Sequence, residues 1–153
     1  MKKLSLIVSL VTGICIAAAG PVFGGKNEDA QKARKALMKT ISKTNKAMKA
    51  ASKKGDMAAV EKNAAKLATE FAKIPNPCLF LKGSAKGSRS KAAVWDNWSD
   101  FEAKAKTSHK LAKAVASQAK MGHTSETGAL VKAFGKEACG SCHKPYRKKK
   151  KKK

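Results

Sequence analysis

The stretch that decides the fold is Cys-Gly-Ser-Cys-His at residues 139–143, close to the C-terminus of a chain of 153 residues. Its two thiols, Cys139 and Cys142, are three residues apart and lie on one side of a helical turn. Each thiol can therefore add to one vinyl group of the same porphyrin. The next residue, His143, projects toward the ring face and can offer an imidazole nitrogen to the iron. The pattern predicts one covalently attached haem c.

Two other sites that use a C-x-x-C pair are less favoured. A zinc site needs a second pair of ligands, whereas His109, His123 and Cys78 stand far apart in the sequence. A thioredoxin-like redox pair needs a βαβ context, and no strand pattern surrounds residues 139–143. The sequence does not assign a role to Cys78.

The N-terminus has the layout of a secretory signal peptide. Lys2 and Lys3 form a short positive region, residues 4–19 are apolar and uncharged, and small residues follow. The apolar run is shorter than the ~20 residues that a membrane span needs. We expect residues 1–24 to be a signal peptide, with the mature N-terminus between Gly20 and Gly25. Export to the periplasm suits haem attachment, which in bacteria takes place outside the cytoplasm.

The rest of the chain favours helices, because it is rich in Ala and Lys and poor in aromatic and β-branched residues. Apolar residues recur at the helical period, and Asp56 is a plausible N-cap. Four helices are predicted: residues 27–53, residues 57–73, residues 91–120, and a last helix that Thr124 or Ser125 caps and that continues into the haem motif.

The connections between these helices are short, except for the loop over residues 74–90. Short connections are typical of an antiparallel bundle. The predicted fold class is therefore all-α, an antiparallel four-helix bundle with covalently attached haem. Residues 25–146 are expected to form this one domain, and residues 147–153 a basic C-terminal tail.

Three stretches of the mature sequence form a recognisable pattern: Glu28-Asp29-Ala30 followed by Arg34, Trp95 followed by Phe101, and Cys139 to Arg147 with Tyr146 and Arg147 after the histidine. On these stretches the chain resembles the cytochrome c prime family, the class II cytochromes c, across the whole mature sequence. The resemblance implies a bundle with haem near one end, His143 as the proximal iron ligand, and a distal face covered by the first helix.

The resemblance also assigns roles on the first helix. In the family, the residue four after the first-helix arginine lies over the distal iron position, which here gives Met38 after Arg34. A low-spin subgroup carries methionine there, so Met38 is expected as the distal ligand of an electron-transfer protein. Arg34 is expected to approach a haem propionate, with a solvated surface position as the alternative.

An open distal site is the main alternative to ligation by Met38. Methionine on the apolar face of a helix commonly fills the core, and Met48 lies on about the same face as Met38. A five-coordinate iron would instead bind nitric oxide or carbon monoxide. Pro145 departs from the family pattern, because it removes a backbone donor in the final turn; this leaves the position of Arg147 open.

The formal charge of the chain is +24, with 34 basic and ten acidic residues. The expected signal peptide holds two of the basic and none of the acidic residues, so its removal leaves +22. A field this positive steers anionic partners, namely an acidic redox protein or an anionic membrane surface. Nucleic acid is not expected for an exported protein, and a homodimer stays open.

The basic tail is the part of the chain most suited to such binding, although a charge run can also be simply solvated. A third hypothesis therefore makes the chain a basic polyanion-binding protein with an incidental haem. No nucleophile–base arrangement or acid–base pair is present in the sequence, so no enzyme activity is predicted.

Overall fold

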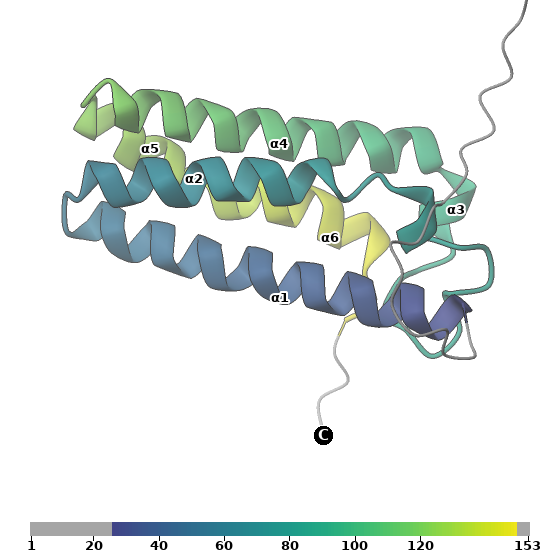
Figure 1. Cartoon of the computed structure of the whole chain (residues 1–153). Helices are drawn as coiled ribbons and strands as arrows, with labels where there is room; N and C mark the ends of the chain where they lie inside the picture. Colours follow the sequence, from purple (N-terminus) through teal and green to yellow (C-terminus); the bar gives the residue numbers. More distant parts are fainter. Residues whose placement is uncertain (1–25, 150–153) are drawn as a thin grey trace, which may run out of the picture.

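Four helical segments run antiparallel along a single bundle in the computed structural model, which describes residues 26–149 (Figure 1). The expected signal peptide and residues 150–153 of the tail lie outside the described residues. The segments are α1 (Lys26–Lys53), α2 (Met57–Ala72), α4 (Trp98–Lys120) and a last segment made of α5 (Thr124–Phe134), η2 (Gly135–Gly140) and α6 (Ser141–Tyr146). Between residues 26 and 149 there is no strand, and one isolated antiparallel bridge joins Ser90 to Arg147.

The predicted cap of the second helix is confirmed. The carboxylate of Asp56 accepts a hydrogen bond from the backbone N–H of Ala59 at 2.9 Å. Gly55, with φ of +72°, turns the chain from α1 into α2. The predicted cap of the last helix is wrong, because α5 begins at Thr124 with His123 at its N-cap and no side-chain cap bond.

The predicted third helix is divided in two. A short α3 (Ala93–Asp96) is followed by Asn97, whose φ of −126° and ψ of 50° lie outside the helical region, and α4 begins at the next residue. Trp95 and Trp98, on either side of the break, both pack against the ring of Phe80. The indole N–H of Trp95 also donates to the Phe80 carbonyl at 2.7 Å. Packing around Phe80 therefore accompanies the change of direction.

The loop over residues 74–90 contains a short 3-10 turn, η1 (Pro77–Leu79), which the side chain of Asn76 caps. The bundle core lies between the four segments, and α2 supplies its regular apolar stripe of Val60, Ala64, Leu67 and Phe71. Met48 of α1 is fully buried in the same core. Full burial of a side chain as large as Val60, Leu67 or Met48 contributes about 1.5–3 kcal/mol.

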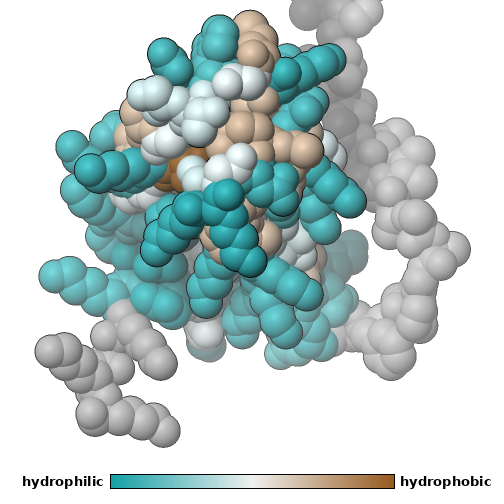
Figure 2. Space-filling model, turned by 90° about the vertical axis from the view of Figure 1, so that its left-hand side faces the viewer, coloured by the Kyte–Doolittle hydropathy of each residue, from teal (hydrophilic) through white to brown (hydrophobic). Residues whose placement is uncertain are grey.

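The end of the bundle that carries the α1–α2 and α4–α5 turns exposes many hydrophilic side chains, which surround a less polar centre (Figure 2). Met121, in the α4–α5 turn, is the one large apolar side chain of residues 26–149 that is mostly exposed. Within the same residues, no helix is both long and apolar enough to cross a bilayer.

Candidate functional site

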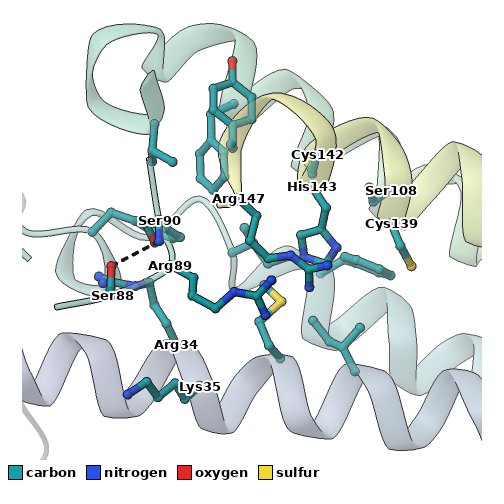
Figure 3. A pocket seen from close by; sticks show the side chains of 18 of the residues that line it. Arg34, Lys35, Ser88, Arg89, Ser90, Ser108, Cys139, Cys142, His143 and Arg147 are labelled. Atoms are coloured by element: carbon teal, nitrogen blue, oxygen red, sulfur yellow. Dashed lines mark hydrogen bonds between the residues drawn. The ribbon is translucent and has the colours of Figure 1, made fainter. Parts of the chain in front are cut away.

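A cavity of about 420 Å³ lies between α1, α4, the last helical segment and the loop over residues 74–90 (Figure 3). Its walls are largely apolar, and its volume falls in the usual range for small-molecule and cofactor sites. The apolar and aromatic lining comes from all four helical segments and the loop: Met38, Ile41, Phe71, Ile74, Phe80, Val94, Phe101, Ala138 and Tyr146.

The three residues of the predicted haem motif all line this cavity. Cys139 comes from η2, and Cys142 and His143 come from α6. Both cysteines are half-buried and carry free thiols. Burial raises the pKa of the Cys139 thiol and raises that of Cys142 to about 11. The thiols are therefore protonated at neutral pH and available for addition to a carbon–carbon double bond.

The imidazole of His143 is suited to bind a metal. Burial lowers its pKa, and the positive charges of Arg147 and Arg89 lower it further. The neutral form, which these effects favour, is the one that carries a free nitrogen lone pair. Figure 3 shows the imidazole directed from α6 into the space above α1, with the Arg147 side chain beside it.

The predicted distal residue lines the same cavity from α1. Met38 is half-buried there, whereas Met48, three turns further along, is fully buried in the core and is not part of the lining. The structure thus brings Met38 and His143 to one cavity and leaves Met48 outside it.

Arg34 lines the cavity and is buried, with 7% of its surface exposed. It is not the solvated arginine of the alternative interpretation. Its guanidinium donates to the Leu79 carbonyl and, at 2.8 Å each, to the hydroxyl and the carbonyl of Ser84. It also lies 5.1 Å from the centroid of the Phe80 ring. Arg34 therefore fastens the loop to α1 beside the cavity, and contact with a propionate stays a prediction.

Gln31 strengthens the same attachment. Its amide donates to the carbonyls of Ser84 and Lys86, at 3.2 and 2.7 Å. The opposite side of the loop pairs with the C-terminal segment, where the Lys148 N–H donates to the Arg89 carbonyl at 2.8 Å. No sequence pattern predicts this loop as a cavity wall, because its contacts with α1 join residues 45 to 55 positions apart.

Pro145 lies within α6, and the helix ends one residue later at Tyr146. Arg147 then adopts an extended conformation with φ of −120°, which permits the bridge to Ser90. This places the Arg147 side chain, whose position the sequence left open, on the cavity lining. The proline thus coincides with the change from helix to a strand-like segment.

Positive charge surrounds the cavity. Its lining includes five basic residues and no acidic residue, and all of these except Arg34 are exposed: Arg34, Lys35, Lys39, Arg89 and Arg147. A haem combines a flat apolar body with two carboxylates, so apolar walls with a cationic edge match both of its parts. Two thiols and a neutral imidazole complete the donor set. The residues present therefore fit a covalently attached haem.

Comparison with known proteins supports this assignment. Residues 29–147 match the sequence model of the family described as Cytochrome C'. The chain is 32% identical to cytochrome c-556 from Agrobacterium fabrum, over 98% of this chain and 99% of that protein. It is also similar to the solved structure of cytochrome c' from Rhodobacter sphaeroides, with 29% identity, a TM-score of 0.69, and coverage of 81% of this chain and 98% of that one.

A further similar structure is a nitric oxide complex of a mutant of cytochrome c prime from Alcaligenes xylosoxidans. It has 26% identity and a TM-score of 0.71, with coverage of 84% of this chain and 100% of that one. The four-helix fold, the cavity and the sequence match all indicate the same family. The chain belongs to the cytochrome c' family and carries one covalently attached haem c.

Proposed function

We propose that this protein transfers single electrons, with His143 as the proximal and Met38 as the distal iron ligand. The observation that carries the proposal is that Met38, on α1, and His143, on α6, line the same cavity. When bound, haem supplies a one-electron iron couple whose potential depends on the axial ligands and on burial. The apolar walls exclude water. The positive charge of the basic residues at the cavity edge favours the reduced state, which carries one more negative charge than the oxidised state.

Gas binding is the second candidate function. The similar structure from Alcaligenes xylosoxidans is a nitric oxide complex, which favours a distal position that small gases can reach. Met38 is half-buried, and a thioether that only lines the wall would leave the sixth position open. The two candidates therefore differ in what the Met38 sulfur contacts.

The deciding experiment is spectroscopy of the natural protein and of Met38→Leu, which removes the sulfur and nearly conserves volume. Ligation by Met38 predicts a low-spin reduced protein, a weak near-infrared sulfur-to-iron band in the oxidised form, and slow binding of carbon monoxide. Met38→Leu should become high-spin and bind carbon monoxide at least tenfold faster, because no ligand must first leave.

Met48→Leu is the matched control, since it removes a sulfur from the same helix outside the cavity. Its spectrum and its rate of carbon monoxide binding should equal those of the natural protein. A natural protein that is already high-spin and binds carbon monoxide rapidly would refute Met38 ligation and establish the gas-binding alternative.

We further propose an acidic redox protein as the partner, met in the periplasm. The proposal is supported by the basic rim of the cavity, which consists of the exposed residues Lys35, Lys39, Arg89 and Arg147. Surface charge of one sign accelerates the encounter with a partner of the other sign. The double substitution Lys35→Glu with Lys39→Glu should lower the association rate with an acidic redox protein. Lys62→Glu with Lys66→Glu has the same spacing on exposed positions of α2 and should have a smaller effect.

Vesicles of anionic lipid test the alternative partner, a membrane surface. If the double substitution Lys35→Glu with Lys39→Glu weakens vesicle binding more than it slows association with the acidic protein, the membrane is the favoured partner. Equal rates for both double variants would show that net charge alone, and not the rim, steers the encounter.

A further inference from the structure

The last helical segment contains a wide turn, η2 (Gly135–Gly140), between α5 and α6. The backbone N–H of Ser141 donates to the carbonyl of Lys136, five residues back. In a regular α-helix it would donate to Glu137, four residues back. Single π-turns of this kind are uncommon, and they occur frequently at functional sites.

The wide turn changes the direction in which all later side chains point. His143 follows the fully buried Thr127 by 16 residues. At about 100° per residue, a regular helix would place His143 about 160° from Thr127, on the outer side. One extra residue absorbed in the wide turn reduces this angle to about 60°. The wide turn therefore brings His143 toward the cavity.

Tyr146 shows the same effect independently. It follows Thr127 by 19 residues, which in a regular helix leaves it about 100° from the buried face. With one extra residue in the wide turn, Tyr146 falls on the same face as Thr127, and it is buried, with 6% of its surface exposed. One face of the segment can therefore bury both Thr127, before the wide turn, and Tyr146, after it, only if the turn contains the extra residue.

Ser108 of α4 contacts this turn from within the core. Its hydroxyl is within 2.9 Å of the Ala138 carbonyl, inside η2, and within 2.9 Å of the Lys104 carbonyl of its own helix. Ser108 is buried, with 1% of its surface exposed, and it lines the cavity. A mid-helix serine commonly bonds only the carbonyl four residues back, so the contact to Ala138 links two helices.

We propose that Ser108 is a positioning residue for haem attachment. Its hydroxyl holds the carbonyl of Ala138 and so stabilises the wide turn, which in turn directs His143 and the neighbouring thiols into the cavity. Each thiol adds across one vinyl double bond, with its sulfur bonding to one carbon and its proton going to the other, so no oxidant or reductant is consumed. The role is independent of whether Met38 binds iron.

The test is to count thioether bonds by mass spectrometry of the mature holoprotein. Ser108→Ala should raise the share of chains with one or no thioether at least threefold, and Ser108→Thr, which keeps a hydroxyl, should restore most of the attachment. Thr107→Ala is the matched control, because its hydroxyl bonds the Ala103 carbonyl on the exposed side of the same helix. It should attach haem like the natural protein.

A second measurement reports on the turn itself. Loss of one net hydrogen bond corresponds to about a fivefold change in a local equilibrium, so amide exchange at Ser141 should accelerate by about that factor in Ser108→Ala. Leu67→Ala provides a variant of reduced global stability with an intact turn. It should keep both thioethers, which separates positioning from general destabilisation.

Deletion of Lys136, an exposed residue of the wide turn, is the strongest perturbation. It should produce a regular helix and remove the vibrational signature of histidine ligation, because His143 then points away. Normal attachment and normal exchange in Ser108→Ala would overturn the proposal. If the deletion variant does not accumulate, the three Ser108 and Thr107 variants decide the question by themselves.

Discussion

The second helix and the last helical segment of the bundle differ in regularity. α2 has a side-chain cap at Asp56, an unbroken apolar stripe and no interruption. The last segment has no side-chain cap, a wide turn at Gly135–Gly140 and Pro145 inside its final turn. It nevertheless supplies the two cysteines predicted to attach haem and the histidine predicted to bind iron. Regular geometry therefore belongs to the helix that stabilises the bundle, and irregular geometry to the one that carries the chemistry.

This difference follows from what each helix must satisfy. α2 needs only to present one apolar stripe, for which the 3.6-residue period suffices. The last segment must bury Val131 and Phe134 in the core and also direct His143 and Tyr146 into a cavity further along. A single regular helix does not meet both requirements, so the two helices should respond differently to substitution.

The largest effect is expected in the last segment. Cys139→Ala with Cys142→Ala should abolish covalent haem, because both thioether bonds are lost. Haem should remain with the natural chain under denaturing electrophoresis and under extraction with acid and acetone, and should be absent from the double variant. Free extraction of haem from the natural protein would contradict the assignment.

The next largest effect is expected in the core of α2. Leu67 is fully buried, and Leu→Ala at such positions costs about 2–5 kcal/mol of the free energy of unfolding. Urea titration should show this loss, while the haem spectrum below the transition should not change. Lys66→Ala, at the exposed neighbouring position, should change stability by less than about 0.5 kcal/mol. A changed haem spectrum in Leu67→Ala would show that α2 also shapes the site.

The sequence predicted the regular helix better than the irregular one, for a physical reason. Asp56 and the stripe from Val60 to Phe71 are local signals, so the limits and cap of α2 followed from them. The break at Asn97 and the wide turn are accompanied by contacts with Phe80 and Ser108, which are remote in sequence. A periodic pattern contains no information about such contacts.

The candidate site shows the same division. Cys139, Cys142 and His143 were predicted because they form a contiguous motif, and Arg34 and Met38 because they match a family pattern. The loop at Ser84 to Ser90 was not predicted as a cavity wall. Its placement depends on hydrogen bonds from Gln31 and Arg34 to loop atoms, which only the folded chain brings together.

The difference in capping between the two helices predicts opposite changes of stability. Asp56, the N-cap of α2, has φ and ψ of −78° and 84°, and His123, the N-cap of α5, has −76° and 79°. Asp56→Ala should cost about 1 kcal/mol, whereas His123→Asp should gain about 0.5–1 kcal/mol because the backbone already has the capping geometry. The gain is reduced by loss of the exposed contact between the His123 ring and Gln118 at 2.7 Å.

Chemical denaturation of both variants provides the measurement. His123→Asn is the matched control for charge, since it can cap α5 without adding a carboxylate. Stabilisation by Asp but not by Asn would assign the effect to the charge and the helix dipole. No stabilisation by either would show that α5 has no need of a side-chain cap.

The smallest effect concerns the final turn of the last segment and depends on pH. Burial, followed by the hydrogen bond that the Tyr146 hydroxyl donates to the Asp100 carboxylate, raises the pKa of Tyr146 to about 12. An ordinary tyrosine has a pKa of about 10, so the folded state holds this proton more tightly than the unfolded state does. The contribution of Tyr146 to stability is therefore complete below pH ~10 and is lost as the pH rises toward 12.

The informative quantity is the difference in pH dependence of stability between the natural protein and a variant without the Tyr146 hydroxyl. Between pH 8 and pH 11, the urea midpoint of the natural protein should fall more than that of Tyr146→Phe, which has no proton to lose at this position. Tyr146 is the only tyrosine of the chain, so phenolate absorbance reports its titration directly. Asp100→Asn should lower the titration midpoint, because the neutral amide neither accepts the hydroxyl hydrogen as strongly nor repels the phenolate. Equal pH dependence in the natural protein and in Tyr146→Phe would show that the contact between Tyr146 of α6 and Asp100 of α4 does not stabilise the final turn. The bridge between Ser90 and Arg147 would then be the contact that holds this turn in place.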